Sequence, residues 1–373
     1  RQLVADVSLG LFLSSGVDSS LLAALVNKHF AGGTDFNFFT VAFSEQTSSD
    51  ESDDAFSFIQ GFQNPRLISH QLTIDAELIG NRLDTMYEFV DEPFGDPATL
   101  LNWVIASKAK EHVTVVLSGD GADELFWGYN RYDQWKNPAL TFSSFRIPGA
   151  PASIIKPFIP GGFYQTKAEL ELSTNPVERH FNLFLSPALE HLRQEPPWNL
   201  DSWAMHHIAL VKEREDLPAI MDLKTYLADA MLYKVDRASM ASSLEVRVPY
   251  LDNKVIDYAL ALPFSFKSNS QFRHKAILKQ LLQHLAPHYD IRRPKKGFNF
   301  PLERWLRSAW KDKVLGMVDK NCLQSFGLDD KIYLPMIQNY YAGDKKPAIV
   351  LWYLLNLALW KQKFEKITPL SST

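Results

Sequence analysis

The chain has 373 residues, of which 46% are hydrophobic and 22% are charged. This composition is typical of a globular protein with a large buried core, and the length allows one to three domains. The formal net charge of −4 excludes an overall positive field that would attract nucleic acid. Because Cys322 is the only cysteine, no disulfide can form within the chain, which fits a reducing compartment and predicts a cytoplasmic protein.

Neither a signal peptide nor a membrane-spanning segment is visible in the sequence. The longest apolar run, residues 348–360, is shorter than the ~20 residues that cross a bilayer, and we interpret it as a buried helix. The chain begins with Arg1 and reaches a distinctive motif soon afterwards. We therefore expect a fragment of a longer protein.

The first third of the chain alternates between strand-like and helix-like patterns. Apolar and β-branched runs predict strands at 7–15, 36–43, 66–74 and 112–124, the last running into a polar loop. Helical spacing of apolar residues predicts helices at 18–30, 49–62, 75–90 and 98–111. This alternation predicts an α/β fold with a doubly wound parallel sheet.

Local signals also predict where these elements end. Asp18 or Ser19 is placed to cap the first helix, and the glycine pair at 32–33 ends it. The acidic run at 50–54 suits the N-terminus of the second helix. From about residue 136 the chain is rich in proline, and beyond 165 it reads as helices only.

The stretch SSGVDS, residues 14–19, lies between the first predicted strand and the first predicted helix. Its backbone N–H groups and hydroxyls, with the positive end of the helix, predict an anion site. Gly16 lets a ligand approach the backbone closely. Asp18 opposes a phosphate unless a divalent cation lies between them, so the combination predicts phosphate with Mg²⁺. The alternative is a helix-capping turn, and the Walker pattern is absent because no Gly-Lys-Ser/Thr follows.

A second polar loop, in LSGDGADELFWGY at 117–129, follows the fourth predicted strand. If the strands ending at Leu13 and Leu117 are neighbours, Asp18 and Asp123 converge beyond the carboxyl ends of the strands. Two such carboxylates can share a Mg²⁺ that also holds polyphosphate. The alternative is a glycine-rich turn with solvated acids.

Three further stretches combine charges with loop or helix patterns. The first, 232–252, suits either a buried ionic network or a substrate shell. The basic stretch RRPKKGFNFP at 292–301 suits either a surface charge run or a cationic clamp for charge that develops during phosphate chemistry. The acidic stretch at 91–100 suits a loop or the cap of the helix that follows.

Several common site patterns are missing. No HExxH or Cys/His ligand spacing is present, which argues against zinc. No G-x-S-x-G elbow occurs, and no GxGxxG follows a strand, so a serine hydrolase and a dinucleotide fold of that type are unsupported.

Read in order, from DVSLGLFLSSGVDSS to VLWYLLNLALWKQKF, these motifs resemble the synthetase domain of the asparagine synthetases. That family belongs to the N-type ATP pyrophosphatases, whose loop reads S-G-G-x-D-S. Ser15 stands here at the first glycine, which is tolerable if its φ is negative. The resemblance implies an adenine nucleotide alpha hydrolase-like α/β sheet with a C-terminal helical half. The implied divisions of a synthetase domain over 1–365 are a nucleotide-binding core at 1–135, a variable insertion at 136–220, a helical part completing the site at 221–365, and a tail at 366–373.

The resemblance implies a two-step reaction with ATP and Mg²⁺. ATP and the side-chain carboxylate of aspartate give β-aspartyl-AMP and pyrophosphate, and ammonia then displaces AMP. Asp18 and Asp123 are implied to hold the Mg²⁺. The implied nucleotide-binding residues are Leu13, Ser14, Ser15, Gly16, Asp18, Ser19, Val41, Ser118, Gly119 and Asp123.

Three residues are implied to have catalytic roles. Lys295 matches the lysine that stabilises charge as the α-phosphate is attacked, although Lys296 is adjacent. Asp120 is implied near the acceptor amine, and Glu245 is the third candidate. A wider group is implied to shape the acceptor pocket: Asp91, Glu92, Asp236, Arg237, Glu245 and Arg247.

The resemblance also bears on partners. Glutamine-dependent relatives carry an N-terminal glutaminase domain with a cysteine at its mature N-terminus, and this chain shows no such domain. We expect the fragment to have lost it, so that the chain alone uses ammonia and the full protein takes nitrogen from glutamine. A homodimer is among the assemblies that we consider, whereas nucleic acid and membrane partners are not expected.

Two alternatives stay open at the level of sequence. One is another adenylating relative, such as a β-lactam synthetase, a lasso-peptide cyclase or an amidotransferase for a surface sugar or peptide; Asp120 and RPKKGF favour the asparagine branch. The other is a catalytically inactive nucleotide-binding or scaffold module, against which Asp18, Asp123 and Lys295 argue.

Overall fold

The computed structural model describes residues 1–30, 35–44, 52–133, 180, 214–292, 301–344 and 347–367. The chain divides into two compact units. The first consists of Arg1–Asp120, Asp229–Val255 and Ile277–Thr373, and the second consists of Gly121–Ala228 and Ile256–Ala276. The predicted insertion at 136–220 and the tail at 366–373 lie largely outside the described residues, so the predicted domain boundaries stay predictions.

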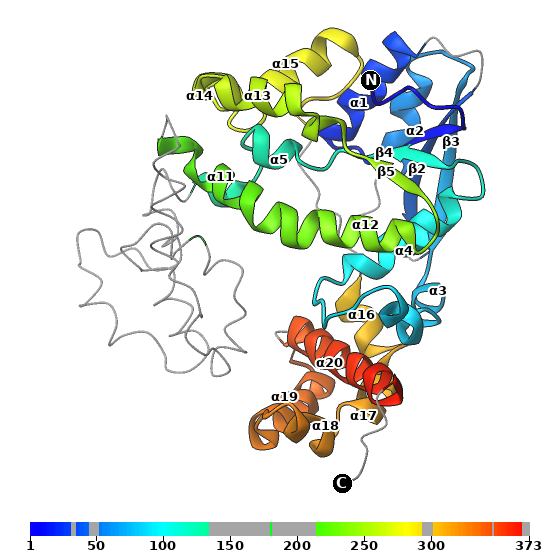
Figure 1. Cartoon of the computed structure of the whole chain (residues 1–373), viewed down its shortest axis with the longest axis vertical. Helices are drawn as coiled ribbons and strands as arrows, with labels where there is room; N and C mark the ends of the chain where they lie inside the picture. Colours follow the sequence, from blue (N-terminus) through cyan, green and yellow to red (C-terminus); the bar gives the residue numbers. More distant parts are fainter. Residues whose placement is uncertain are drawn as a thin grey trace. The chain divides into compact units, whose positions relative to one another are not determined.

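The first unit is built on a five-stranded sheet whose neighbouring strands are all parallel (Figure 1). The order across the sheet is β3-β2-β1-β4-β5. The strands are β1 (Leu9–Phe12), β2 (Phe36–Phe43), β3 (Leu67–Ile74), β4 (Val115–Leu117) and β5 (Glu245–Arg247). The predicted α/β class and parallel sheet are therefore confirmed.

Burial on both faces explains why the first strands are apolar along most of their length. Phe38 and Phe39 are consecutive, so their side chains point to opposite faces of the sheet, yet both are buried. Leu11 in β1 is fully buried as well. Parallel strands that are covered on two sides have this composition.

The chain changes direction across the sheet beside β1. From β1 it moves outward to β2 and β3, then returns to place β4 against the other side of β1, with Leu11 opposite Leu117. Crossovers between parallel strands are right-handed, so building outward in both directions puts helices on both faces. Ligands of such sheets bind beyond the carboxyl ends of the strands where the order reverses.

Helices α1 (Val17–His29), α2 (Ser52–Gln60) and α4 (Ala98–Ala109) occupy predicted positions, with acidic residues in the first turn of α2. The predicted helix over 75–90 is instead α3 (Ala76–Gly80) followed by the 3-10 helix Leu83–Glu88. Asp75 caps α3 by accepting a hydrogen bond from the Leu78 N–H at 2.7 Å. The break follows Gly80, where a Cβ would lie 2.9 Å from Trp310 Nε1 and where glycine has low helix propensity.

The expectation of helices only beyond residue 165 is wrong at β5. Glu245 pairs with Val115, and Arg247 pairs with Leu117, at the outer edge of β4. Three residues, two of them charged, give no strand pattern of their own. The strand forms because the edge of β4 offers backbone hydrogen bonds, so tertiary context overrides local propensity.

The remaining described helices fall in both units. In the first unit lie α12 (Tyr233–Met240), the 3-10 helix Pro249–Leu251, most of α15 (Ala276–Leu285), α16 (Leu302–Arg307), α17 (Lys311–Met317), α18 (Lys320–Ser325), α19 (Asp330–Ala342) and α20 (Ala348–Ile367). In the second lie α5 (Ala122–Leu125), α11 (Leu217–Lys224), α14 (Phe264–Lys267) and the 3-10 helices Asn130–Tyr132 and Arg214–Asp216. The π-helix Tyr226–Leu232 and α13 (Asn253–Ala261) span the boundaries between the units.

Helix α20 contains the long apolar run near the C-terminus. It packs against α16, α17 and the 3-10 helix Leu83–Glu88 (Figure 1). Leu351, Trp352 and Leu355 are fully buried there, so the predicted buried helix is confirmed. In the part of the chain that the structure describes, no helix combines the length and apolarity needed to cross a membrane.

Two glycines of the first unit, one in the sheet and one in a helix, should differ sharply in how much stability a change to alanine costs. A Cβ at Gly10 in β1 would lie 2.7 Å from the buried Phe39 ring and 3.0 Å from the Asn37 carbonyl, whereas a Cβ at Gly316 in α17 would meet nothing within 4 Å. We expect Gly10→Ala to lower the free energy of unfolding by about 1–3 kcal/mol through overpacking. Gly316→Ala should leave it unchanged or raise it by up to about 1 kcal/mol. Urea denaturation followed by circular dichroism measures both, and equal effects would contradict the prediction.

Candidate functional site

The loop after β1 is closed by serine hydroxyls. The Ser19 hydroxyl donates to the Ser14 carbonyl at 3.0 Å, and the Ser14 N–H donates back to the Ser19 hydroxyl at 3.1 Å. The Gly16 N–H donates to the Ser14 hydroxyl at 3.2 Å. These bonds fold the loop into a tight turn before α1.

The expected cap of α1 needs correction. The helix begins at Val17 with Gly16 at the N-cap position, so neither Asp18 nor Ser19 caps it. Ser19 uses its hydroxyl to close the loop instead, and Asp18 lies in the first turn. Backbone N–H groups in the first turn of a helix have no partner within the helix and favour an anion.

Ser15 adopts ordinary backbone geometry. It is not among the residues with positive φ, and its side chain is buried. The first glycine of the family pattern can therefore be replaced here without placing a side chain in the left-handed region.

The loop after β4 meets the loop after β1, as the sequence predicts. The strands before these loops are neighbours, with Leu11 opposite Leu117. A Cβ at Gly119 would lie 3.1 Å from Asp18 Cβ and 3.4 Å from the Ser19 nitrogen. Glycine therefore lets the second loop lie against the first turn of α1.

The residues around Gly119 are held by two hydrogen bonds of Ser118. The Ser118 N–H donates to the Arg247 carbonyl at 2.9 Å, which ties the loop to β5. The Ser118 hydroxyl donates to the Asp120 carboxylate. The structure therefore gathers Ser118, Gly119 and Asp120 beside the first loop.

Leu13 and Val41 lie at the same edge of the sheet. The Leu13 N–H donates to the Phe39 carbonyl at 2.8 Å, which extends the β1–β2 pairing by one residue. Val41, two residues farther along β2, is half-buried and pairs with Leu72. Both predicted adenosine contacts therefore lie at carboxyl ends of neighbouring strands.

Asp123 belongs to the second unit, where it is held by a lysine that the sequence did not indicate. Lys275 Nζ lies 2.7 Å from an Asp123 carboxylate oxygen, and the lysine side chain is only 6% exposed. A Cβ at Gly128 would lie 2.0 Å from that carboxylate and 2.2 Å from Lys275 Cε, so only glycine fits beside the pair. The predicted approach of Asp123 to Asp18 stays a prediction, since the two residues belong to different units.

A second charged group that the sequence did not indicate centres on the fully buried Asp222. Its carboxylate accepts hydrogen bonds from the Arg131 guanidinium, from the Tyr132 hydroxyl at 2.7 Å and from His180 Nε2 at 2.6 Å. Burial raises the pKa of Asp222, but the His180 hydrogen bond and the charges of His180 and Arg131 outweigh it, so its pKa is lowered. The cluster fixes the chain just beyond the 117–129 motif.

Glu124 is buried next to Asp123. It accepts a hydrogen bond from the Tyr129 hydroxyl at 2.8 Å. Burial, with the neighbouring charge of Asp123, raises the pKa of Glu124 to about 7. Tyr129 in turn lies under the Arg131 guanidinium, whose Cζ is 3.6 Å from the ring centroid.

The acidic stretch at 91–100 is bound to α12. Asp91 accepts hydrogen bonds from the Tyr233 hydroxyl at 2.6 Å and from Arg237 at 3.3 Å. Lys234, nearly buried, donates to Asp96 at 2.6 Å. The structure thus joins two of the stretches that we connected with an acceptor pocket. Asp91 and Arg237 are exposed, as are Glu92 and Asp236.

Glu245 lies at the amino end of β5, whereas the two loops leave the carboxyl ends of their strands. Its carboxylate accepts a hydrogen bond from Arg247 Nε at 2.6 Å. Arg247 also donates to the carbonyls of Gln2 and Val4, each at 2.9 Å. These bonds tie the start of the chain to β5. Lys295 and Lys296 lie outside the described residues.

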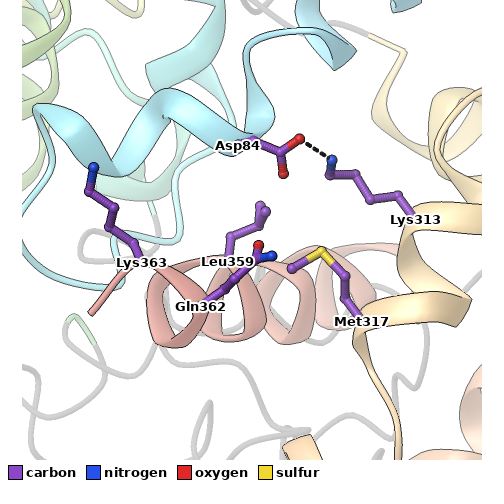
Figure 2. A pocket seen from close by; sticks show the side chains of 6 residues that line it. All are labelled: Asp84, Lys313, Met317, Leu359, Gln362 and Lys363. Atoms are coloured by element: carbon purple, nitrogen blue, oxygen red, sulfur yellow. Dashed lines mark hydrogen bonds and ion pairs between the residues drawn. The ribbon is translucent and has the colours of Figure 1, made fainter. Parts of the chain in front are cut away.

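A surface pocket of about 470 Å³ lies elsewhere in the first unit, and none of its lining residues was predicted as a site residue. Figure 2 shows Asp84 and Lys313 in its lining, where they form an ion pair with Nζ and the carboxylate oxygen 2.6 Å apart. Met317, Leu359, Gln362 and Lys363 complete the lining. Its lining combines parts of α17, α20 and the 3-10 helix Leu83–Glu88.

Comparison with known protein families shows which family the chain belongs to. The family model described as asparagine synthase matches residues 1–362. The chain belongs to the asparagine synthase family.

Curated relatives agree with this assignment. The chain is 27% identical over 370 residues to asparagine synthetase [glutamine-hydrolyzing] 1 of Bacillus subtilis, covering 95% of this chain and 56% of that protein. It is 30% identical over 380 residues to a putative asparagine synthetase [glutamine-hydrolyzing] of Mycobacterium bovis, covering 98% and 56%. A more distant relative is the amidase chyE of Penicillium rubens, 24% identical over 370 residues, covering 88% and 54%. The chain thus spans little more than half the length of these relatives.

The Asp222 cluster predicts a stability effect that depends on pH. The folded-state pKa of Asp222 is lowered from 3.8, so its charge contributes stability above about pH 3.8 and loses that contribution as the pH falls through the folded-state pKa. We expect Asp222→Asn to lower the free energy of unfolding by about 3 kcal/mol at neutral pH, because Arg131 loses its buried counter-charge. The gap to the wild type should narrow below about pH 3.8.

Urea denaturation at a series of pH values measures this gap. Asp257→Asn, at an exposed aspartate of the same unit, is the matched control and should change the unfolding free energy by less than about 0.5 kcal/mol. A gap for Asp222→Asn that stays constant through acid pH would contradict the assignment of charge to this carboxylate.

Proposed function

We propose that this chain carries out the synthetase reaction of an asparagine synthetase: ATP-dependent amide formation from aspartate and ammonia, giving asparagine, AMP and pyrophosphate. The observation that supports it most is the contact between the first turn of α1 and Gly119, at the point where the strand order reverses. An anion-binding loop at that point suits a nucleotide. Membership of the asparagine synthase family gives the reaction class.

In this proposal the loop after β1 holds the phosphates. The hydroxyls and N–H groups of Ser14, Gly16 and Ser19, with the positive end of α1, receive the pyrophosphate portion. Leu13 and Val41 contact the adenosine from the edge of the sheet, and Ser118 and Gly119 lie beside it. Asp120 faces the acceptor amine. Glu245 stays a sequence-based prediction that its position at the amino end of β5 does not favour.

The residues present also fit Mg²⁺. Mg²⁺ takes carboxylate oxygens together with phosphate oxygens and water, and Asp18 provides a carboxylate in the first turn of α1. Among the described residues no group of three or more His, Cys, Asp or Glu side chains is arranged to hold a metal, so the phosphates would supply part of the ligand set. We propose Asp18 and Asp123 as the protein ligands. When bound, Mg²⁺ supplies neutralisation of the phosphate charge.

Lys295 has the role of stabilising charge on the α-phosphate while the aspartate carboxylate attacks it. A fixed ammonium group aimed at developing charge lowers the barrier without reorganising in the transition state. The attack forms a bond from the carboxylate oxygen to the α-phosphorus and releases pyrophosphate. Ammonia then attacks the β-carbonyl carbon of the adenylate and displaces AMP. The adenylate is sensitive to hydrolysis, so the site must exclude water during this interval.

In the full-length protein we propose that ammonia comes from glutamine. The relatives from Bacillus subtilis and Mycobacterium bovis are named glutamine-hydrolyzing, and this chain covers about 56% of each. The chain by itself is therefore proposed to use free ammonia. A cytoplasmic location suits this substrate and the single cysteine.

The proposal is tested with the purified chain, ATP, Mg²⁺, ammonium chloride and either aspartate or a panel of other carboxylic acids. Pyrophosphate release and asparagine formation are measured together. Release that requires aspartate, with asparagine as product, supports the proposal. No release with aspartate contradicts it, and release with another carboxylate would identify a related adenylating enzyme instead.

The assignment of Lys295 predicts a difference between adjacent lysines. We expect Lys295→Ala to lower the rate of pyrophosphate release by about 10²–10³-fold, the usual effect of removing one group that stabilises transition-state charge. Lys296→Ala is the matched control, because it removes the same charge one residue away, and it should stay within a few fold of the wild type. Steady-state release assays at saturating ATP decide between them. A large loss in Lys296→Ala with an active Lys295→Ala would reverse the assignment.

A further inference from the structure

Two tyrosine hydroxyls from distant parts of the first unit donate to backbone carbonyls, one in the loop after β1 and one in the first turn of α1 that follows it. Tyr289 donates to the Ser15 carbonyl at 2.7 Å. Tyr250, in the 3-10 helix after β5, donates to the Asp18 carbonyl at 3.0 Å. Neither tyrosine belongs to a motif that the sequence connected with the nucleotide.

A hydrogen bond to a backbone carbonyl also affects the direction of the next N–H group, because both belong to one peptide unit. A trans peptide unit is planar, so its carbonyl and the N–H of the next residue point in opposite directions. The Ser15 carbonyl shares its peptide unit with the Gly16 N–H, before α1 begins. The Asp18 carbonyl lies within α1, whose backbone already sets the orientation of its peptide unit. A hydrogen bond that holds the carbonyl on one side therefore holds the N–H on the other.

An anion-binding loop needs this orientation. Backbone N–H groups attract a phosphate, whereas a carbonyl turned toward the phosphate repels it. In the structure the Gly16 N–H is directed to the Ser14 hydroxyl at 3.2 Å, and Ser14 itself is exposed. The side of the loop opposite the Tyr289 bond is thus the side on which the N–H and the exposed hydroxyl gather.

Tyr289 is held in place by aromatic packing on α2. Its ring lies edge-on to Phe58, with centroids 5.4 Å apart, and His288 stacks on the same phenylalanine at 5.2 Å. His288 Nε2 donates to the Phe58 carbonyl at 3.0 Å. A Cβ at Gly61 would lie 2.4 Å from His288, so the glycine permits this close packing. The contact with the buried Phe58 therefore restricts the Tyr289 ring, whose hydroxyl reaches the Ser15 carbonyl.

We infer that Tyr289 is a positioning residue for the pyrophosphate portion of ATP, acting through the Ser15–Gly16 peptide. This inference rests on the proposed function, because it assigns the phosphates to this loop. Tyr289 acts through the peptide and not by contact with the nucleotide. It keeps the N–H group of Gly16 on the side of the loop where the phosphates bind.

The test compares ligands that carry or lack the pyrophosphate portion. Tyr289→Phe keeps the ring on Phe58 and removes only the hydroxyl. We expect it to weaken binding of Mg²⁺-pyrophosphate and Mg²⁺-ATP by about 2- to 10-fold, the size of one hydrogen bond, while AMP binding changes by less than 2-fold. Isothermal titration calorimetry measures each affinity.

Tyr341→Phe is the matched control. Its hydroxyl also donates to a backbone carbonyl, that of Leu306 at 3.2 Å, but in the C-terminal helices of the same unit. It should leave all three affinities unchanged, while urea denaturation reports how much folding stability each variant loses.

The outcomes separate the inference from the proposed function. Equal affinities of the wild type and Tyr289→Phe for pyrophosphate and ATP would overturn the inference and leave the proposed function intact. Equal losses for AMP and pyrophosphate would assign Tyr289 a structural role only and would overturn it as well. A wild-type chain that binds neither pyrophosphate nor ATP would overturn both.

Discussion

The pairing of β1 with β4 is the constraint on which the candidate site depends. These strands are far apart in the sequence, yet Leu11 lies opposite Leu117, so both chains leave the sheet at the same edge. The loops that follow must then meet, and Gly119 removes the side chain that would otherwise collide with Asp18. Neither loop alone defines a nucleotide site. Parallel pairing next to the reversal in strand order turns two ordinary turns into one surface lined with N–H groups, hydroxyls and a carboxylate.

The second unit contains carboxylates that are held by ion pairs in crowded surroundings. Asp123 and Asp222 both carry charge in crowded surroundings, and each has a cationic partner, Lys275 in one case and Arg131 in the other. A carboxylate that loses its partner in such surroundings costs far more than an exposed one. Lys275 and Asp222, the partners that hold the segment from Asp123 to Arg131, therefore lie outside the 117–129 motif that contains Asp123. A metal that binds Asp123 would compete with the Lys275 ammonium group already in place.

How much the sequence predicts depends on whether a signal is local. Strands β1 and β2 follow from apolar runs because both faces of the sheet are buried there, and the loop at 14–19 follows from its composition. Strand β5 could not be predicted, since Glu245 and Arg247 give it no apolar pattern and the edge of β4 creates it. Lys275 and Tyr289 could not be predicted either, because their importance comes from partners far along the chain. The prediction that Asp18 or Ser19 caps α1 was wrong for another reason: Ser19 uses its hydroxyl within the loop, and Gly16 occupies the N-cap position before the helix begins at Val17.

Ser15 affects how ordered the loop after β1 is. It stands where the family pattern has glycine, and it has no positive φ. A glycine there would leave the Ser14–Ser19 turn freer to rotate its peptides, since glycine restricts neither φ nor ψ. Serine narrows that freedom through its buried side chain, and Tyr289 narrows it further through the carbonyl of the same residue. Both restrictions act on the peptide whose N–H belongs to Gly16. The substitution and the tyrosine bond therefore work in one direction, toward a loop whose donors are ordered before an anion binds, which reduces the entropy that binding must otherwise remove.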